Sequence, residues 1–259
     1  MANSLHPAAV LFDWGHTLVR FPGVLTDHGG HRACLRRVYE ELRLLAGAED
    51  EAGSPDGIDW QRFHSAYEAV TIELIERSHR SGREHSFQER LAETLNRVGV
   101  AGSADRHERL ARTLARHMAA RSEPMDGARE VLDALAGRAR LGVVSNYPSA
   151  ATVLGSLTHV GLGERLDVVV VSEQVGWLKP HRRPFEAALE ALGDVEAGDV
   201  LFVGDDPVND VSGARAMGFR TAWLAPPDAG ATVDGADLRL ASLHELLEHL
   251  ELDVPGYES

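Results

Sequence analysis

Short, wholly apolar runs alternate with helical patterns through the second half of the chain, and this alternation restricts the possible folds more than any other feature. A strand without polar alternation is buried on both faces, which is typical of a parallel sheet with helices on either side. The sequence therefore predicts an α/β fold with a doubly wound, Rossmann-like parallel sheet. The expected strands are residues 8–12, 141–145, 168–171, 200–203 and 220–224, and the expected helices are about 127–137, 149–159, 182–192 and 208–217.

Residues 21–123 have a different pattern, because apolar residues recur there at helical spacing and no strand-like run interrupts them. We therefore predict an α/β core formed by residues 1–20 and 124–252, and an inserted all-helical cap domain formed by residues 21–123. The last residues, 253–259, are expected to be a flexible tail. The cap has 15 arginines against 17 acids, so it is the expected source of positive groups facing an anionic substrate.

Charge and hydropathy exclude several classes of partner. The formal net charge of −14 disfavours binding to nucleic acid or to an anionic membrane. No apolar stretch is long enough to span a bilayer, the first residues lack the pattern of a secretory signal, and the single cysteine, Cys34, cannot form an intrachain disulfide. These features predict a cytoplasmic protein with no nucleic-acid or membrane partner.

Polar residues stand at the carboxyl ends of three of the expected strands. Asp13, Ser145 and Asp205 each stand where an apolar run ends, and the carboxyl ends of parallel strands meet at one edge of a sheet. Two more acids, Asp206 and Asp210, follow within five residues of Asp205. Carboxylates this close repel one another unless a cation compensates them, and hard divalent cations prefer oxygen ligands. The pattern favours a Mg²⁺ site at this edge.

Lys179 is the only lysine among 26 basic residues, and the other 25 are arginines. Arginine and lysine exchange readily at ordinary surface positions, but a planar guanidinium cannot replace a compact ammonium in a tight pocket. A composition biased towards arginine therefore singles out Lys179 as a residue with a specific role.

Four short motifs, in order and each attached to the expected element, resemble those of the haloacid dehalogenase superfamily. They are Asp13-Trp-Gly-His-Thr-Leu18, Ser145-Asn146, Lys179-Pro180, and Gly204-Asp-Asp-Pro-Val-Asn-Asp210. The resemblance covers the whole core and places residues 21–123 where that family carries a helical cap. It implies a hydrolase acting on a small phosphorylated metabolite.

The same resemblance implies a role for each matched residue. Asp13 would be the nucleophile that forms an aspartyl-phosphate, and Lys179 would bridge Asp13 and the phosphate. Thr17, Ser145 and Asn146 would donate hydrogen bonds to phosphoryl oxygens. The ligands of Mg²⁺ would be Asp13, the backbone carbonyl of Gly15, Asp205 and, directly or through water, Asp210.

One position departs from the family pattern. Phosphatases of this family usually carry a second aspartate two residues after the nucleophile, as the general acid and base, and here that residue is Gly15. Such a group contributes about 10²–10⁴-fold to the rate. Three hypotheses follow: His16 substitutes for it, the leaving group needs no acid, or the protein is catalytically weak.

Two other functions remain open on the sequence. A metal-independent haloacid-type dehalogenase also uses this aspartate and lysine and also lacks the second aspartate, but it has no need for the acidic cluster at 205–210. A catalytically weak phosphate-binding relative is favoured by Gly15 and disfavoured by the otherwise complete set of motifs.

Overall fold

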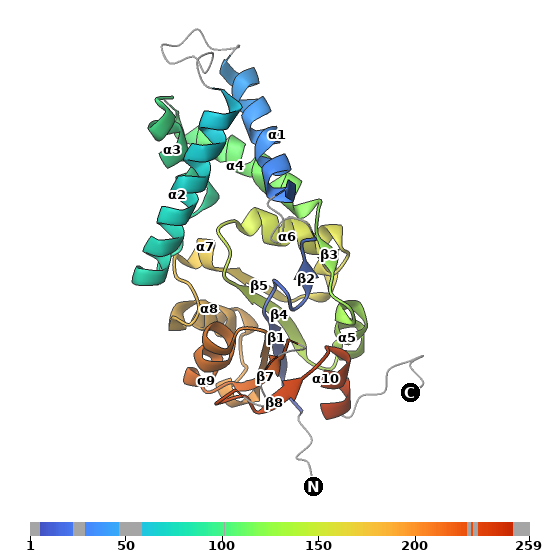
Figure 1. The fold of residues 1–259 in the computed structure, drawn as a ribbon. Coiled ribbons are helices and arrows are strands. Elements are labelled where there is room, and N and C mark those ends of the chain that lie inside the picture. The colour runs from blue at the N-terminus through green and yellow to red at the C-terminus, as the bar shows by residue number, and fades with distance from the viewer. Residues whose placement is uncertain are drawn as a thin grey trace.

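The centre of the protein is a six-stranded parallel sheet (Figure 1). The structure is a computed structural model and describes residues 6–22, 29–46, 59–100, 102–226, 229 and 233–250. In the spatial order β5-β4-β1-β6-β7-β8, the strands are Val168–Val171, Arg140–Ser145, Ala9–Phe12, Val200–Gly204, Arg220–Leu224 and Leu238–Leu240. The predicted fold class is confirmed, and β8, whose three residues include an arginine, was not predicted.

Helices cover both faces of this sheet. The α-helices are α5 (Ala128–Leu135), α6 (Ala150–His159), α7 (Ser172–Val175), α8 (Arg182–Leu192), α9 (Gly213–Ala216) and α10 (His244–His249), with a π-helical turn at Pro207–Ser212 and 3₁₀ turns at Gly163–Arg165 and Ala197–Asp199. Alternate residues of β1 enter different apolar clusters, Val10 and Phe12 on one face and Ala9 and Leu11 on the other. Burial on both faces explains why the central strand β1 is wholly apolar.

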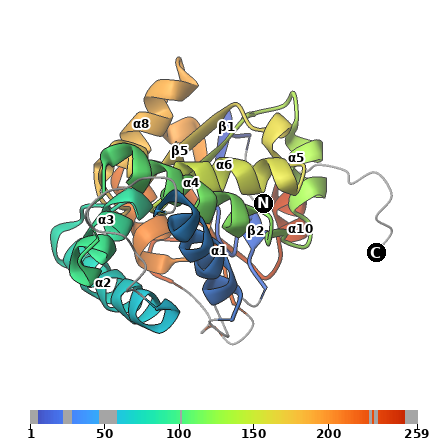
Figure 2. The same cartoon turned by 90° about the horizontal axis from the view of Figure 1, so that it is seen from above.

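Four longer helices stand beyond the carboxyl ends of the strands, and Figure 2 shows them in front of the sheet when it is viewed from above. They are α1 (Gly29–Ala46), α2 (Trp60–Ser81), α3 (Phe87–Val98) and α4 (Ala104–Ala119). The side chains of Asp59, Ser86 and Ser103 cap the N-termini of α2, α3 and α4, which fixes where each begins. None of the described helices is long and apolar enough to cross a membrane.

A short two-stranded ribbon joins the four helices to the sheet. β2 (Val19–Arg20) pairs antiparallel with β3 (Glu123–Pro124), so the chain leaves and returns at the same place. Neither strand contains an apolar run, so this pairing was not predicted from the sequence. The expected domain boundaries at 20/21 and 123/124 fall within the ribbon. The expected tail, 253–259, lies outside the described residues.

Candidate active site

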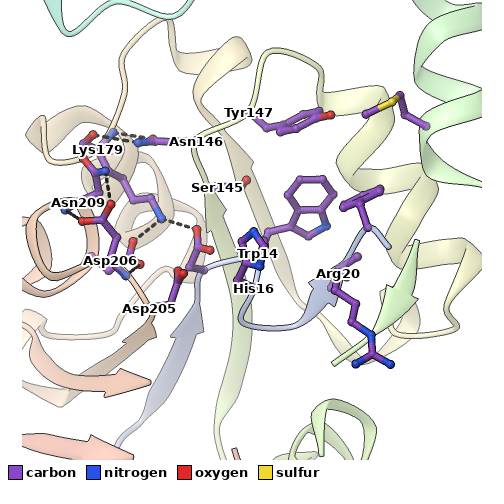
Figure 3. A pocket seen from close by; sticks show the side chains of 16 residues that line it. Trp14, His16, Arg20, Ser145, Asn146, Tyr147, Lys179, Asp205, Asp206 and Asn209 are labelled. Carbon is purple, nitrogen blue, oxygen red and sulfur yellow. Dashed lines mark hydrogen bonds and ion pairs between the residues drawn. The ribbon is translucent and has the colours of Figure 1, made fainter. Parts of the chain in front are cut away.

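The carboxyl ends of β1, β4 and β6 bring the strand-end residues together around a pocket of about 260 Å³ (Figure 3). Asp13 follows β1, Ser145 ends β4 and Asp205 follows β6, and all three line the pocket. The backbone N–H of Asp13 donates to Val203 O at 2.8 Å, which fixes the backbone of Asp13 against the neighbouring strand. The sequence reasoning placed these residues at one sheet edge, and the structure shows them there.

The ammonium of Lys179 lies between two carboxylates. Its Nζ donates to Asp13 Oδ1, to Asp210 Oδ1 and to the backbone O of Val144, each at 2.7 Å. These three acceptors use all three N–H donors of an ammonium group. The residue is only 2% exposed. Burial alone would lower the pKa of Lys179, but Asp13 and Asp210 outweigh burial and raise it, so the side chain stays charged.

Asn146 holds the backbone of Lys179 with its amide group. Its Nδ2 donates to the backbone O of Lys179 at 2.9 Å, and its Oδ1 accepts from the backbone N–H of Lys179 at 2.6 Å. The sequence reasoning expected Asn146 to donate to phosphoryl oxygens. In the structure both ends of its amide serve the lysine, although the residue also lines the pocket.

The acidic residues divide into two groups by their contacts. Oxygens of Asp13, Asp205 and Asp210 lie within 4.8 Å of one another, as ligands of a single ion would. The side chain of Asp206 instead accepts from the backbone N–H groups of Val208 and Asn209 and caps the following turn. The side chain of Asp206 thus stabilises the local turn.

Burial makes the charged form of these carboxylates costly. It raises the pKa of Asp13 to about 7, with Lys179 opposing the shift and Asp210 adding to it. It also raises the pKa of Asp205 to about 6, and the charge of Asp210 contributes to this shift. A divalent cation between Asp13 and Asp205 would offset both costs, so the donor set fits Mg²⁺. Asp210 has both oxygens engaged, because Oδ2 accepts from the backbone N–H of Asp206 at 3.0 Å.

The two hydroxyl residues expected to bind phosphate lie in different environments. Ser145 lines the pocket. Thr17 is fully buried, its Oγ1 has no hydrogen-bond partner, and it is not among the described residues that line the pocket. His16 is exposed whereas Thr17 and Leu18 are buried, so of the two hydroxyl residues only Ser145 lines the pocket.

The turn that follows Asp13 exposes His16 at the pocket. His16 adopts a left-handed backbone conformation (φ 59°), and its N–H donates to Val19 O at 2.8 Å. His16 is exposed and lines the pocket. A Cβ atom added at Gly15 would meet no atom within 4 Å, so the position of the missing aspartate opens onto free space.

The wall of the pocket opposite Lys179 holds the rings of Trp14 and Tyr147, with Arg20 beside them, as Figure 3 shows. Trp14 and Tyr147 make an edge-to-face contact with ring centroids 4.7 Å apart, and Phe21 and Met118 complete the wall. Trp14 also donates from Nε1 to Ser156 Oγ at 3.0 Å, so it serves both the pocket and the core. Tyr147, Phe21 and Met118 lie outside the four sequence motifs, so nothing in the sequence indicated them as wall residues.

A buried lysine and a cluster of three carboxylates thus converge at the carboxyl edge of a doubly wound parallel sheet. Residues 64–224 match the model of the haloacid dehalogenase-like hydrolase family. The chain belongs to this family.

Curated relatives with similar sequences include phosphatases. The chain is 38% identical over 101 residues to pyrimidine 5'-nucleotidase YjjG of Escherichia coli, covering 39% of this chain and 44% of that one. It is 39% identical over 94 residues to phosphoserine phosphatase of Thermus thermophilus, covering 35% of this chain and 36% of that one. The matched segments thus span less than half the length of these relatives.

Solved structures share the fold over nearly the whole chain. A HAD phosphatase from Thermococcus onnurineus superposes with a TM-score of 0.62 at 22% identity, covering 95% of this chain and 99% of that one. A 2-haloacid dehalogenase from Pseudomonas syringae pv. Tomato superposes with a TM-score of 0.64 at 20% identity, covering 95% and 98%. Both activities occur on this fold, so the fold alone does not distinguish between them.

Proposed function

We propose that the protein is a Mg²⁺-dependent phosphatase that hydrolyses a small phosphorylated metabolite through an aspartyl-phosphate on Asp13. The observation that carries the proposal is the convergence of Asp13, Asp205 and Asp210 within 4.8 Å around Lys179. Displacement of a halide from carbon needs the nucleophile and the lysine but has no use for the further carboxylates. Phosphoryl transfer needs cations that neutralise charge spreading over the phosphoryl oxygens.

In the proposed reaction, a carboxylate oxygen of Asp13 attacks phosphorus, the bond from phosphorus to the leaving oxygen breaks, and the leaving oxygen takes up a proton. Water then attacks the phosphorus, which releases inorganic phosphate and restores Asp13. Lys179 Nζ, held 2.7 Å from Asp13, keeps a positive charge beside the nucleophile as the anionic phosphoryl group approaches. Ser145 donates to a phosphoryl oxygen.

Asp13 and Asp205, with the backbone carbonyl of Gly15, are the proposed ligands of Mg²⁺. When bound, the ion supplies positive charge for the phosphoryl oxygens and offsets the repulsion between the carboxylates. Asp210 would orient Lys179 and contact the ion through a water molecule, since each of its oxygens already accepts a hydrogen bond.

The helices α1–α4 are the proposed cap domain (21–123) over a core of residues 1–20 and 124–252. Met118 at the end of α4 lines the pocket, so this segment contributes directly to the site. The names of the relatives agree with a phosphorylated substrate. The net charge of −14 argues for a small anionic molecule steered by local positive groups rather than for nucleic acid.

Release of inorganic phosphate from a panel of small phosphomonoesters tests the proposal directly. We expect turnover with Mg²⁺ and none with excess EDTA, and restored turnover when Mg²⁺ is added back. Full activity in EDTA on a 2-haloacid, with release of halide, would establish the dehalogenase alternative instead. No turnover of any ester or haloacid would leave the phosphate-binding alternative, which Gly15 favours.

Mg²⁺ affinity should fall as the pH is lowered through the raised pKa values of Asp13 and Asp205. A carboxylate binds a metal in its deprotonated form, so below about pH 6 protons compete with the ion for both groups. We expect the Kd for Mg²⁺ to increase by roughly tenfold or more between pH 7.5 and pH 5.5. Calorimetric titration in two buffers of different ionisation enthalpy measures both the affinity and the protons released.

The matched control for this titration is Asp206→Asn. Its carboxylate caps a turn and does not belong to the cluster of Asp13, Asp205 and Asp210, so the variant should change the Kd for Mg²⁺ by less than about threefold. Asp205→Asn should bind at least tenfold more weakly at pH 7.5. A Kd that is the same at both pH values contradicts the assignment of the ligands.

His16 is the proposed source of the proton for the leaving group. We expect His16→Ala to slow hydrolysis of an alkyl phosphate by about ten- to a hundredfold and that of nitrophenyl phosphate by less than about threefold, because only the alkoxide needs a proton as it leaves. Steady-state kcat on the two esters measures the difference. Adding Gly15→Asp to His16→Ala should restore the alkyl rate, because the space beyond Gly15 is open.

A glycine that also faces open space but lies away from the pocket provides the control. Gly198→Asp introduces the same side chain and should leave the ratio of the two rates unchanged. An equal loss on both esters in His16→Ala would show that His16 positions or packs the turn and supplies no proton.

A further inference from the structure

Arg90 is a buried cation without a carboxylate partner. It lies on the inner face of α3, is 8% exposed, and forms no ion pair with any residue that the structure describes. Its Nε has no hydrogen-bond partner. Three other arginines of the four-helix segment, Arg77, Arg97 and Arg109, each pair with a glutamate and are much more exposed. A charge removed from water without a counter-ion is costly and needs an explanation.

The groups around Arg90 do not supply the missing anion. The Glu84 carboxylate lines the same cavity as Arg90, and the charge of Arg90 opposes the rise of its pKa, but its Oε2 accepts from Ser172 Oγ at 2.6 Å and its Oε1 from the backbone N–H of His85 at 2.9 Å. Burial raises the pKa of Glu84, which weakens it further as a counter-ion. The other neighbours of the guanidinium are the hydroxyl of Tyr67, which is uncharged at neutral pH, and the Phe87 ring at 5.8 Å.

Arg90 faces a cavity of about 670 Å³ between the helices α2 and α3 and the loops of the active site. Ser78, whose Oγ is buried without a hydrogen-bond partner, lines the same cavity from α2. Three residues, Asn146, Lys179 and Asn209, line both this cavity and the pocket of Asp13. The cavity and the active-site pocket are therefore adjacent, because the same loop residues line both.

We propose that Arg90 and Ser78 form a second anion subsite, which holds a carboxylate or a second phosphate of the substrate remote from the phosphoryl group attacked by Asp13. The inference rests on the proposed phosphatase function and narrows its substrates to small phosphorylated compounds with a further anionic group. The planar guanidinium can donate two parallel hydrogen bonds to either a carboxylate or a phosphate. Ser78 Oγ–H adds a neutral donor beside it.

Pairs of substrates that differ only in the distal anion test this subsite. Glycerate 3-phosphate is compared with glycerol 3-phosphate, and propane-1,3-diol bisphosphate with 3-hydroxypropyl phosphate, which distinguishes a carboxylate from a phosphate. In the wild type we expect kcat/KM to favour the doubly anionic member of at least one pair by about ten- to a hundredfold. In Arg90→Met the preference should fall below about threefold while the rate on the singly anionic member is unchanged.

Thermal unfolding separates this role from a structural one. Replacing an unpaired buried cation by an apolar side chain of similar length should leave Tm unchanged or raise it, whereas loss of a structural arginine lowers it. Arg97→Met, on the same helix with its ion pair to Glu73 at the surface, is the control and should keep the substrate preference. Equal rates on both members of each pair in the wild type, or an equal loss on both in Arg90→Met, overturns the proposal.

Binding without turnover tests the subsite separately from the proposed function. 3-Phosphonopropionate and propylphosphonate are titrated calorimetrically into the wild type and Arg90→Met with Mg²⁺ present. Tighter binding of the carboxylated compound that disappears in the variant supports the subsite even if no ester is hydrolysed. Propane-1,3-bisphosphonate, which offers a distal phosphonate, is titrated in the same way, and equal binding of all three compounds by the wild type rejects the subsite, whatever the turnover experiments show.

Discussion

Asp13→Asn should abolish turnover, with kcat reduced on the order of 10⁴-fold or more, because no other described carboxylate that lines the pocket can take over the attack. Asp205 belongs to the proposed metal site, Asp210 has both oxygens engaged, and Asp206 caps a turn. Steady-state phosphate release measures the loss. Rapid quenching of the wild type should also trap phosphate bound covalently to residue 13.

The variant should remain folded, which distinguishes a catalytic loss from a structural one. Burial raises the pKa of Asp13 to about 7 from its usual 3.8, so ionisation of this carboxyl costs stability as the pH rises through that range. A neutral asparagine avoids this cost, and Lys179 keeps its bonds to Asp210 and Val144. We expect the Tm of the variant at pH 7.5 to equal or exceed that of the wild type. Residual activity above a few per cent would place the nucleophile elsewhere.

The strands and the three strand-end residues could be predicted because burial determines both. A parallel strand covered on both faces has no position for a polar residue, so β1 is wholly apolar as far as Phe12 and a charge appears only at Asp13. The topology then brings Asp13 and Asp205 to the same edge whatever the helices between them do. Lys179 was identified by composition, because a single lysine among 26 basic residues contrasts with the bias towards arginine.

The contacts of individual polar side chains could not be predicted. They depend on the direction in which each side chain points, whereas the sequence pattern indicates only its position along a strand or helix. The sequence shows an asparagine after a strand, but it does not show whether the amide contacts a substrate or the backbone of Lys179. In the structure, the amide of Asn146 contacts the backbone of Lys179. Thr17 follows His16 in the turn, but it points inwards to full burial. A two-residue ribbon such as β2–β3 forms through backbone pairing, which leaves no apolar pattern to detect.

The contacts of Arg90 could not be predicted from the sequence either. It is one of 15 arginines in residues 21–123, and the sequence distinguishes it from the others only by its place on the inner face of a helix. Its burial and its lack of an ion pair emerge only when α2 and α3 pack together. That residues 21–123 supply positive groups to the substrate stays a prediction, and Arg90 is the candidate on which the proposed subsite rests.

Lys179→Arg should lower kcat by about 10²–10³-fold while leaving the protein folded. The guanidinium retains the charge, but three acceptors at 2.7 Å from a single nitrogen surround a site built for a compact ammonium. The larger group must move away from at least one of Asp13, Asp210 and Val144 O. Because the contact with Asp13 matters most as charge develops on the phosphoryl group, the loss should appear in kcat more than in KM.

Lys179→Met shows what the charge itself contributes. Without a cation, Asp13 and Asp210 remain buried and unpaired, and removal of one partner of such a network typically costs about 3–5 kcal/mol of stability. We therefore expect Lys179→Met to lower Tm strongly at pH 7.5 and less at pH 5, where protonation of Asp13 relieves the repulsion. Arg182→Lys, an exposed conservative exchange on the helix that follows, is the control for both measurements. If Lys179→Arg keeps more than half of the wild-type kcat, the lone lysine reflects composition, and the charge alone suffices at this position.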